Sequence, residues 1–299
     1  FTTHTTGILT LGGEGTLPGS WGSTSSLATN KNDTYFAATK GIVNNSCTGP
    51  SITSQPVALS ICENTGGSFS VSATGASTYQ WQYSGDNTNW VNIDATLNPN
   101  PPIYVSGFTS NTLIITNTPA AWTNNYVRCI VRSSTGCRTN SNAVLLTVSP
   151  TTVGGTVTGG TTICSGSTSG LLTLSGNTGT VTKWQSSVSP FSTWTDIAHT
   201  ATTYTSGALT ATTQFRAVVQ SGSCVSANSV ATTITVSSSN TWTGTTSSSW
   251  FTATNWSCGS LPTAASDVTV PNVSPQPQPI VDGSSTIALA NTLTVSSGA

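Results

Sequence analysis

Cysteine has the clearest chemistry of any residue type in this chain, and it occurs twice in closely similar surroundings. The segment ICENTGG occupies residues 61–67, and the segment ICSGSTSG begins at Ile163. The 299 residues include seven cysteines, but only seven Lys and Arg, eight Asp and Glu, and two His. Many cysteines among few other reactive groups predict disulfides and an oxidising, extracellular location. Buried free thiols in a cytosolic protein are the alternative.

The other reactive side chains form no catalytic pattern. His4 and His199 stand in unrelated contexts, and no two acids form the close pair used in glycoside hydrolysis. Asp94 and Asp196 recur near equivalent turns, where turn stabilisation explains them better than catalysis does. No spacing fits a zinc site, a calcium loop or a phosphate loop. We therefore expect a protein that is not an enzyme and that has no cofactor or metal.

Nine tryptophans raise the question of sugar binding, because aromatic faces stack on sugar rings. Trp81 and Trp184 occupy core positions in the pattern described below. Trp242, Trp250 and Trp256 form a cluster near the C-terminus. Since aromatic side chains dominate protein cores, we expect this cluster to be packing, with a role in ligand binding or assembly as the alternative.

The composition excludes several classes of protein. Only 5% of the residues are charged, and the formal net charge is −1. The few basic residues are spread along the chain, so we expect no surface for nucleic acid. No apolar run reaches the ~18 residues of a membrane span. Ser, Thr, Asn and Gly supply the polarity, and Thr favours strands, so the composition predicts an all-β chain.

Two copies of one pattern make up the middle of the chain. The first, SFSVSATGASTYQWQYSGDNTNWVNI, covers residues 68–93, and the second, LLTLSGNTGTVTKWQSSVSPFSTWTDI, covers residues 171–197. Phe69 matches Leu172, and Trp81 matches Trp184, with a gap of 12 residues in each copy (81 − 69 and 184 − 172). Alternating apolar residues between Gly, Asn, Ser and Pro turns predict β-sandwiches of roughly 80 to 100 residues.

The later parts of the copies also match, and they carry the cysteines. YVRCIVRSSTGC (residues 126–137) matches QFRAVVQSGSC (residues 214–224). The match puts Arg128 and Arg216 on the outer face of the equivalent strand, one in each copy. Because the second copy has only Cys164 and Cys224, these two pair if they pair within the domain. By position, Cys62 would then pair with Cys137.

Three cysteines remain outside this scheme. Cys129 matches Ala217 in the second copy, so we expect it to be a buried thiol that acts as a small hydrophobic side chain. A bridge from Cys129 to Cys47 is the alternative. The sequence assigns no role to Cys258.

The repeats resemble the immunoglobulin-like modules of large secreted and surface proteins of Bacteroidota. The resemblance rests on ICEN, YQWQYSGDNTNW, YVRC and TGCRTNSNAVLLTV, and on ICSG, KWQSSVSPFSTW, QFRA and GSCVSANSVATTITV. It implies tandem sandwiches, and it implies export by the type IX secretion route that such proteins commonly use. One departure is Val127, which stands where the family has a Tyr two residues before the late-strand Cys, so a tyrosine corner is in doubt.

The C-terminal residues 241–272 resemble the opening of a β-solenoid-like module, and PIVDGSSTIALANTLTVSSGA would supply its first rungs. The pattern stops at Ala299, so we expect a longer native chain. At the other end, GILTLGG and TYFAATKGIVNNSC predict strands. The expected domains are an N-terminal β segment of unknown type (1–49), two immunoglobulin-like sandwiches (50–150 and 151–238) and a partial solenoid-like module (239–299).

These features favour a non-enzymatic extracellular structural or adhesive protein. Low charge removes a usual protection against edge-to-edge strand pairing, so subunits could assemble into a filament or sheath. The candidate strands lie around residues 7–12 and 291–296. The expected partners are therefore further copies or other cell-surface proteins, with polysaccharide as a third class. The alternatives are a carbohydrate-binding accessory region of a large secreted enzyme and an adhesin tip that binds its ligand as a monomer.

Overall fold

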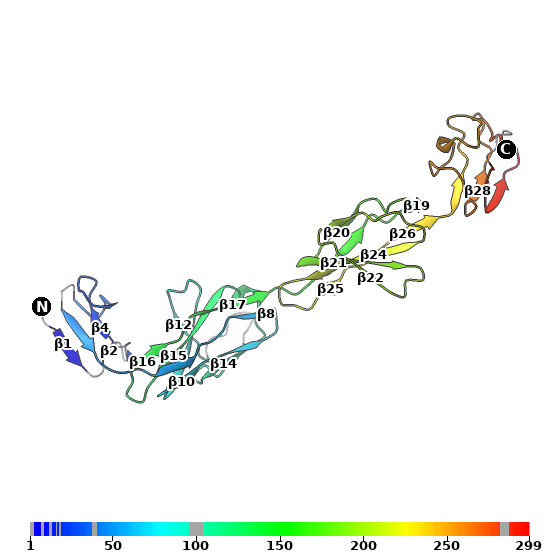
Figure 1. The fold of residues 1–299 in the computed structure, drawn as a ribbon. Coiled ribbons are helices and arrows are strands. Elements are labelled where there is room, and N and C mark those ends of the chain that lie inside the picture. The colour runs from blue at the N-terminus through cyan, green and yellow to red at the C-terminus, as the bar shows by residue number, and fades with distance from the viewer. Residues whose placement is uncertain are drawn as a thin grey trace. The chain divides into compact units, whose positions relative to one another are not determined.

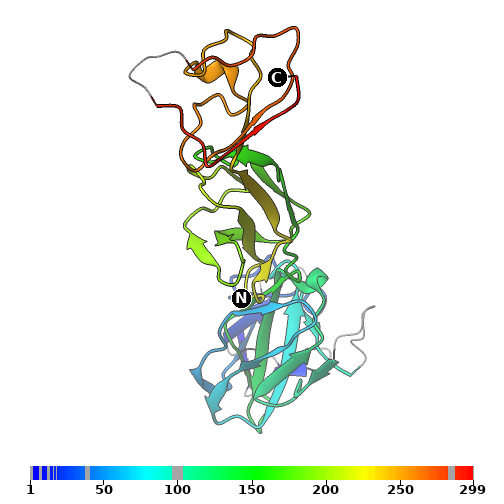
Figure 2. The ribbon, with the colours of Figure 1, turned by 90° about the vertical axis from the view of Figure 1, so that its right-hand side faces the viewer.

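The computed structural model describes residues 3–6, 9–11, 14–15, 17, 19–37, 41–95, 104–281 and 287–298. Strands form nearly all of its regular structure, and the short exceptions are the 3-10 turns η1 (Ala120–Trp122) and η2 (Ala253–Asn255) (Figures 1 and 2). The all-β prediction is therefore confirmed. The chain divides into two compact units, Phe1–Thr151 with Ser221–Cys224, and Thr152–Gln220 with Val225–Ala299. Within the described residues, no helix has the length and apolar character needed to span a membrane.

The N-terminal segment forms a four-stranded sheet in the order β1-β6-β4-β5 and a separate hairpin of β2 and β3. Its strands are β1 (Thr3–Thr6), β2 (Thr10–Leu11), β3 (Glu14–Gly15), β4 (Gly19–Gly22), β5 (Asn30–Lys31) and β6 (Ile42–Asn45). The predicted strand segment GILTLGG contains β2, and TYFAATKGIVNNSC contains β6. Residues 7, 8, 12, 13 and 38–40 of those segments lie outside the described residues.

The first sandwich, which we define as strands β7 to β17, has the arrangement of an immunoglobulin-like domain. One sheet has the order β12-β11-β15-β17-β8, with β16 beside β15, and it faces the sheet β13-β14-β9 and the pair β10-β7. The strands are β7 (Ser51–Ser54), β8 (Leu59–Cys62), β9 (Gly67–Ser70), β10 (Ser72–Thr74), β11 (Thr78–Ser84), β12 (Val91–Asn92), β13 (Tyr104–Ser106), β14 (Thr112–Thr116), β15 (Asn125–Arg132), β16 (Arg138–Asn140) and β17 (Val144–Ser149). All neighbours are antiparallel except β8 and β17, which are parallel.

The second sandwich, strands β18 to β26, repeats this topology. Its larger sheet has the order β19-β26-β24-β21-β22, with β25 beside β24, and its smaller sheet has the order β18-β20-β23. The first strand of the larger sheet is again parallel to the last, since β19 pairs with β26. The strands are β18 (Thr156–Thr158), β19 (Thr162–Cys164), β20 (Leu172–Ser175), β21 (Thr180–Val188), β22 (Thr195–Ile197), β23 (Thr203–Tyr204), β24 (Thr213–Gln220), β25 (Ala227–Asn228) and β26 (Thr232–Ser237).

The two sandwich cores follow from alternation along the strands. Side chains two residues apart point to the same face, so one face of each strand is apolar and buried. Trp81 and Trp184 are fully buried, and their direct cross-strand partners are Cys129 and Ala217. The members of the matched late strands that lie in the two cores are Val127, Cys129 and Val131 in β15, and Phe215, Ala217 and Val219 in β24. Ile130 and Val218 are buried as well, outside these two core clusters. Phe69 and Leu172 lie in the same cores, one in each sandwich.

The C-terminal module contains three parallel strands in the order β27-β28-β29. They are β27 (Ser239–Thr241), β28 (Asp267–Val270) and β29 (Thr292–Val295). Long connections separate them, so each strand adds one layer to the stack, as the rungs of a solenoid do. The red strand beside β28 in Figure 1 is β29.

Candidate functional site

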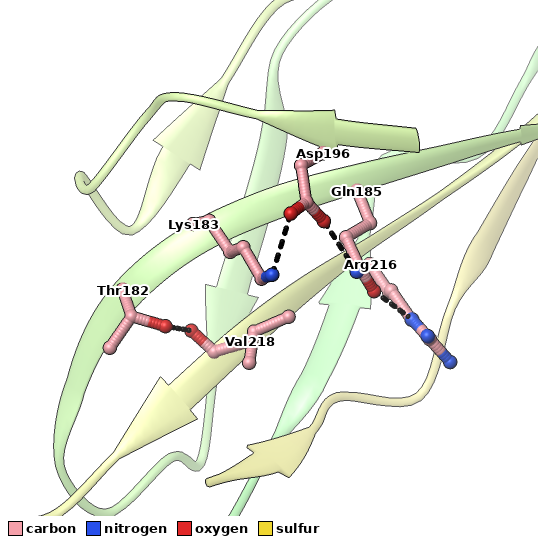
Figure 3. A network of polar contacts seen from close by, with 6 residues as sticks. All are labelled: Thr182, Lys183, Gln185, Asp196, Arg216 and Val218. Carbon is pink, nitrogen blue, oxygen red and sulfur yellow. Dashed lines mark hydrogen bonds and ion pairs between the residues drawn. The ribbon is translucent and has the colours of Figure 1, made fainter. Parts of the chain in front are cut away.

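The outer face of the second sandwich carries a connected set of polar side chains (Figure 3). Lys183 Nζ lies 2.7 Å from Asp196 Oδ2, and Gln185 Nε2 donates a hydrogen bond of 2.7 Å to Asp196 Oδ1. Arg216 Nε donates to Gln185 Oε1 at 2.7 Å. These residues come from the neighbouring strands β21, β22 and β24, and the donors Lys183 and Gln185 hold the pKa of Asp196 below its usual range. These polar groups therefore bond to one another, and their bonds connect the three neighbouring strands.

The first sandwich repeats the Arg–Gln part of this network at the matching positions, with Asn92 in the place of Asp196. Arg128 Nε donates to Gln82 Oε1 at 2.9 Å, and Gln82 Nε2 donates to Asn92 Oδ1 at 2.8 Å. Each arginine also stacks on a tryptophan: Arg128 lies 4.0 Å from the ring centroid of Trp90, and Arg216 lies 3.9 Å from that of Trp194. One face of each of these indole rings is therefore covered by protein, which leaves less surface for a sugar ring.

A local cluster of arginines in the first sandwich was missed by the sequence analysis, which treated the basic residues as dispersed. Arg132 and Arg138 are direct cross-strand neighbours on β15 and β16, and Arg128 lies on the same strand as Arg132. Burial, with a smaller contribution from the charge of Arg138, lowers the pKa of Arg128 to about 10. Spacing along the sequence does not reveal the cluster, because the turn between β15 and β16 brings Arg138 back beside Arg132.

The tryptophans of the C-terminal module form its core. Trp242, Trp250 and Trp256 are 1%, 6% and 3% exposed, and their rings meet edge to face at 5.1 and 4.6 Å. The indole nitrogen of Trp242 donates to the carbonyl of Pro277, and that of Trp256 donates to the carbonyl of Trp250. The expectation that this cluster is packing is therefore confirmed, because the three rings pack against one another in the core of the module.

The clearest exposed apolar surface in this module is the edge strand β29. Leu293 and Val295 are each 56% exposed, although they are in register with Val268 and Val270, which are 1% and 3% exposed. The same columns of side chains are thus buried on β28 and open on β29. Beside them lies a groove of about 290 Å³, lined by Trp250, Val270, Gln278, Pro279, Val281, Leu293 and Val295.

The other candidate assembly strand, around residues 7–12, is described only in part. Thr10 and Leu11 form β2, which pairs with β3 in a hairpin. Residues 7, 8 and 12 lie outside the described residues. That candidate therefore stays a prediction, whereas the other one, residues 291–296 with β29, lies entirely within the described residues.

The structure pairs the cysteines differently from the sequence prediction. The disulfides are Cys47–Cys137, Cys62–Cys224 and Cys164–Cys258. Cys62, Cys137, Cys164 and Cys224 are each half of a disulfide, but the predicted pairs Cys62–Cys137 and Cys164–Cys224 are wrong.

The register of the larger sheet explains this correction. Cys62 pairs with Ser149 at the end of β17, and β17 pairs with the beginning of β15 at Asn125. Cys137 lies beyond the other end of β15, next to Arg138, which pairs with Arg132. A strand of eight residues is ~25 Å long, whereas a disulfide joins Cα atoms only about 4.4 to 6.8 Å apart. Cys62 and Cys137 therefore lie at opposite ends of the larger sheet of the first sandwich.

Cys129 is a buried free thiol, and the alternative bridge to Cys47 is wrong because Cys47 is joined to Cys137. Burial raises the pKa of Cys129 to about 12, so the thiol is protonated and unreactive at neutral pH.

His199 Nε2 lies 2.7 Å from the carbonyl oxygen of Thr203. In the described part of the chain, no three His, Cys, Asp or Glu residues are grouped so that they could hold a metal.

Comparisons with known sequences match two parts of the chain. Residues 153–238 match the domain of unknown function DUF8696, and residues 241–299 match the domain of unknown function DUF8693. No curated protein matches the sequence.

Several solved structures have a similar arrangement of strands. An I-band fragment from titin is 13% identical, with a TM-score of 0.42, over 64% of this chain and 66% of that one. The N-terminal four Ig domains of a Dscam1 isoform are 13% identical, with a TM-score of 0.36, over 66% of this chain and 49% of that one. Extracellular domains 3–5 of Drosophila OTK are 14% identical, with a TM-score of 0.40, over 66% of this chain and 64% of that one. The chain thus spans less than two thirds of the length of each of these structures.

Proposed function

We propose that this protein is a non-enzymatic extracellular structural or adhesive protein whose copies associate through the edge strand β29. The observation that carries the proposal is the exposure of Leu293 and Val295 directly above the buried pair Val268 and Val270. A strand from another copy laid against β29 would bury these side chains and extend the sheet, as would a further rung of the longer native chain that the sequence pattern predicts. Burying apolar surface is the main favourable term in most protein association.

The chemistry of the edge favours a strand over a charged ligand. Residues 287–298, which contain β29, include no Lys, Arg, Asp or Glu. Exposed sheet edges in soluble proteins are usually protected by charges, prolines or bulges, and this one has no charged residue to do so. The groove beside β29 is apolar along Val270, Val281 and Leu293. The surface therefore suits an uncharged partner strand with apolar residues at alternate positions, such as another copy supplies.

The three disulfides support an extracellular location, because such bonds persist in oxidising compartments. As part of the proposal we retain the four modules at residues 1–49, 50–150, 151–238 and 239–299. We also retain export by the type IX route in a Bacteroidota cell, and assembly into a filament or sheath.

Polysaccharide binding has less support than self-association. Six of the nine tryptophans are buried, namely Trp21, Trp81, Trp184, Trp242, Trp250 and Trp256, and two more, Trp90 and Trp194, have an arginine over one face. A sugar site needs an open aromatic face. A titration of polysaccharides followed by tryptophan fluorescence would detect such a site if it exists.

The proposal is tested by placing a charge on the edge. Leu293→Lys puts an ammonium group among the side chains that a partner strand would bury, and a buried unpaired charge is strongly unfavourable. The matched control is Leu171→Lys, since Leu171 is 64% exposed in the second sandwich. Sedimentation velocity and electron microscopy should show concentration-dependent assemblies for the parent and the control, and monomers for Leu293→Lys. A parent protein that stays monomeric at high concentration, or assemblies that survive Leu293→Lys, would refute the role of β29.

A further inference from the structure

Each disulfide joins one module to the module that follows it. Cys62 and Cys164 both end the first strand of the larger sheet in their sandwiches, at β8 and β19. Cys224 and Cys258, their partners, lie in the next module along the chain. Cys47 belongs to the N-terminal segment, before β7, and it bonds to Cys137, which belongs to the first sandwich. The repeated cysteine at the end of the first strand is therefore a link to the next module.

The three loops that these bonds close overlap. They span residues 47–137, 62–224 and 164–258, so every peptide bond between Cys47 and Cys258 lies inside at least one loop. Between Cys137 and Cys164, the loop of Cys62–Cys224 is the only one of the three that spans the backbone. This stretch contains the junction between the two sandwiches.

Close contacts and a glycine turn place Cys224 at this junction. Its Sγ atom lies 3.5 Å from the carbonyl oxygen of Ser149 and 3.3 Å from that of Pro150. Residues Ser221–Cys224 belong to the first compact unit, although they follow β24 of the second sandwich. Gly222 has a φ of +48°, and a Cβ atom there would meet Ser149 Oγ at 2.0 Å, so the turn fits only without a side chain.

We propose that the three disulfides act together as a continuous covalent tether, which keeps the chain in one piece after a backbone cut and limits its extension under tension. The shortest covalent path from Cys47 to Cys258 crosses to Cys137, follows the backbone to Cys164 and crosses again. It contains roughly 30 residues, or ~100 Å when extended, against roughly 210 residues and ~700 Å without disulfides. Most of both sandwiches is thus bypassed.

More than one covalent path limits the extension of the chain, so the loss of one disulfide still leaves a short path. At the junction between the two sandwiches, in contrast, Cys62–Cys224 is the only one of the three disulfides that spans the backbone. Without Cys47–Cys137 or Cys164–Cys258, the path runs through Cys62–Cys224 and contains roughly 50 residues, or ~170 Å. Without Cys62–Cys224, the path stays at ~100 Å, because that bond is not part of it. The same bond is nevertheless the one that holds the parts together after a cut between Cys137 and Cys164. This proposal does not depend on self-association.

The first experiment cuts the chain at one place. A specific protease site is inserted between Gly159 and Gly160, which are exposed and lie between β18 and β19. After cleavage, intact mass spectrometry without reductant should find one covalent species, and two fragments after reduction. Cys62→Ser with Cys224→Ser should give two fragments without reductant, whereas Cys164→Ser with Cys258→Ser should still give one.

Separation of the cleaved parent protein without reductant would overturn the proposal, and this result needs no cysteine variant to fold. The second experiment stretches single molecules held at the N-terminal and C-terminal sides of the tether. Reduction should lengthen the fully extended chain by ~600 Å, the difference between the two paths. An equal length before and after reduction would overturn the limit on extension. The Cys62→Ser, Cys224→Ser variant should match the oxidised parent in this measurement, although it fails in the cleavage experiment.

Discussion

The guanidinium carbon of Arg216 lies 3.9 Å from the centroid of the Trp194 indole ring. The same arginine donates from Nε to Gln185, so its plane is fixed by a stack and by a hydrogen bond. Arg128 is held in the same way by Trp90 and Gln82. Retention of this arrangement in two copies that differ at many other positions indicates that it stabilises the outer face of the sheet.

Arg216→Lys should therefore destabilise the second sandwich although it preserves the charge. An ammonium group cannot stack as a plane or reproduce the Nε bond, and we expect a loss of about 1 kcal/mol. Chemical denaturation of the single variants and of Arg216→Lys with Trp194→Ala measures the coupling. Purely additive effects would show that the stack contributes nothing. Arg128→Lys, with Trp90→Ala, is the matched pair in the first sandwich.

Asn255 should be intolerant of even an isosteric change. Its side chain is fully buried, Oδ1 accepts from the backbone N–H of Thr246 and Ser247, and Nδ2 donates to Ser247 Oγ and to the carbonyl of Ser249. Asn255→Asp removes both donated bonds and buries a charge, so we expect a loss of about 3 kcal/mol in the C-terminal module.

The control for this variant is Asn272→Asp in the same module. Asn272 is exposed and uses its Oδ1 to accept from Ser274, a role that a carboxylate also fills. Thermal unfolding followed by tryptophan fluorescence should move strongly for Asn255→Asp and little for Asn272→Asp. Equal shifts would contradict the role given to Asn255. Asn255-Trp256-Ser257 also matches the Asn-X-Ser pattern of N-glycosylation, and the burial of Asn255 makes its side chain inaccessible to that modification in the folded protein.

Asp86 should make the stability of the first sandwich depend on pH in the acid range. The backbone N–H groups of Asn89 and Thr88 donate to its carboxylate and hold its pKa well below the ordinary value of 3.8. A lowered pKa in the folded state stabilises the fold above pH 3.8, and this contribution is lost as the pH falls from 3.8 toward the folded value.

The comparison with Asp86→Asn isolates that contribution. The difference in melting temperature between the parent and the variant should be full at pH 7 and should shrink below about pH 4. Circular dichroism melts between pH 7 and pH 2 measure it. A difference that is constant over this range would mean that ionised Asp86 does not stabilise the fold.

Cys129 should be replaceable by alanine, because Ala217 occupies the same position opposite Trp184 in the second sandwich. Cys129→Ala should cost about 1 kcal/mol or less, whereas Cys129→Ser buries a hydroxyl and should cost more. Denaturation curves rank the two variants, and the opposite order would contradict the assignment. In the folded parent protein the thiol should also resist alkylation at pH 8, since burial raises its pKa to about 12.

Alternation along the chain was sufficient to predict the strands and the two cores. Phe69, Trp81, Leu172 and Trp184 are buried as the period-2 pattern predicts, because a pleated strand turns every second side chain to the same face. The repeat also predicted that Arg128 and Arg216 share one outer position, where each now stacks on a tryptophan. These are local properties, and a short segment of sequence contains them.

The pairing of the cysteines was decided by the tertiary structure. The repeat suggested that Cys62 and Cys137 pair, but a disulfide depends on the distance between two Cα atoms, and β15 separates these residues along its length. Likewise, the openness of Leu293 and Val295 depends on what lies next to β29 in space. The sequence by itself determined which residues form strands and which face is apolar. Distances between segments remote in the chain arise only on folding, so the links between modules and the exposed edge belong to the tertiary structure alone.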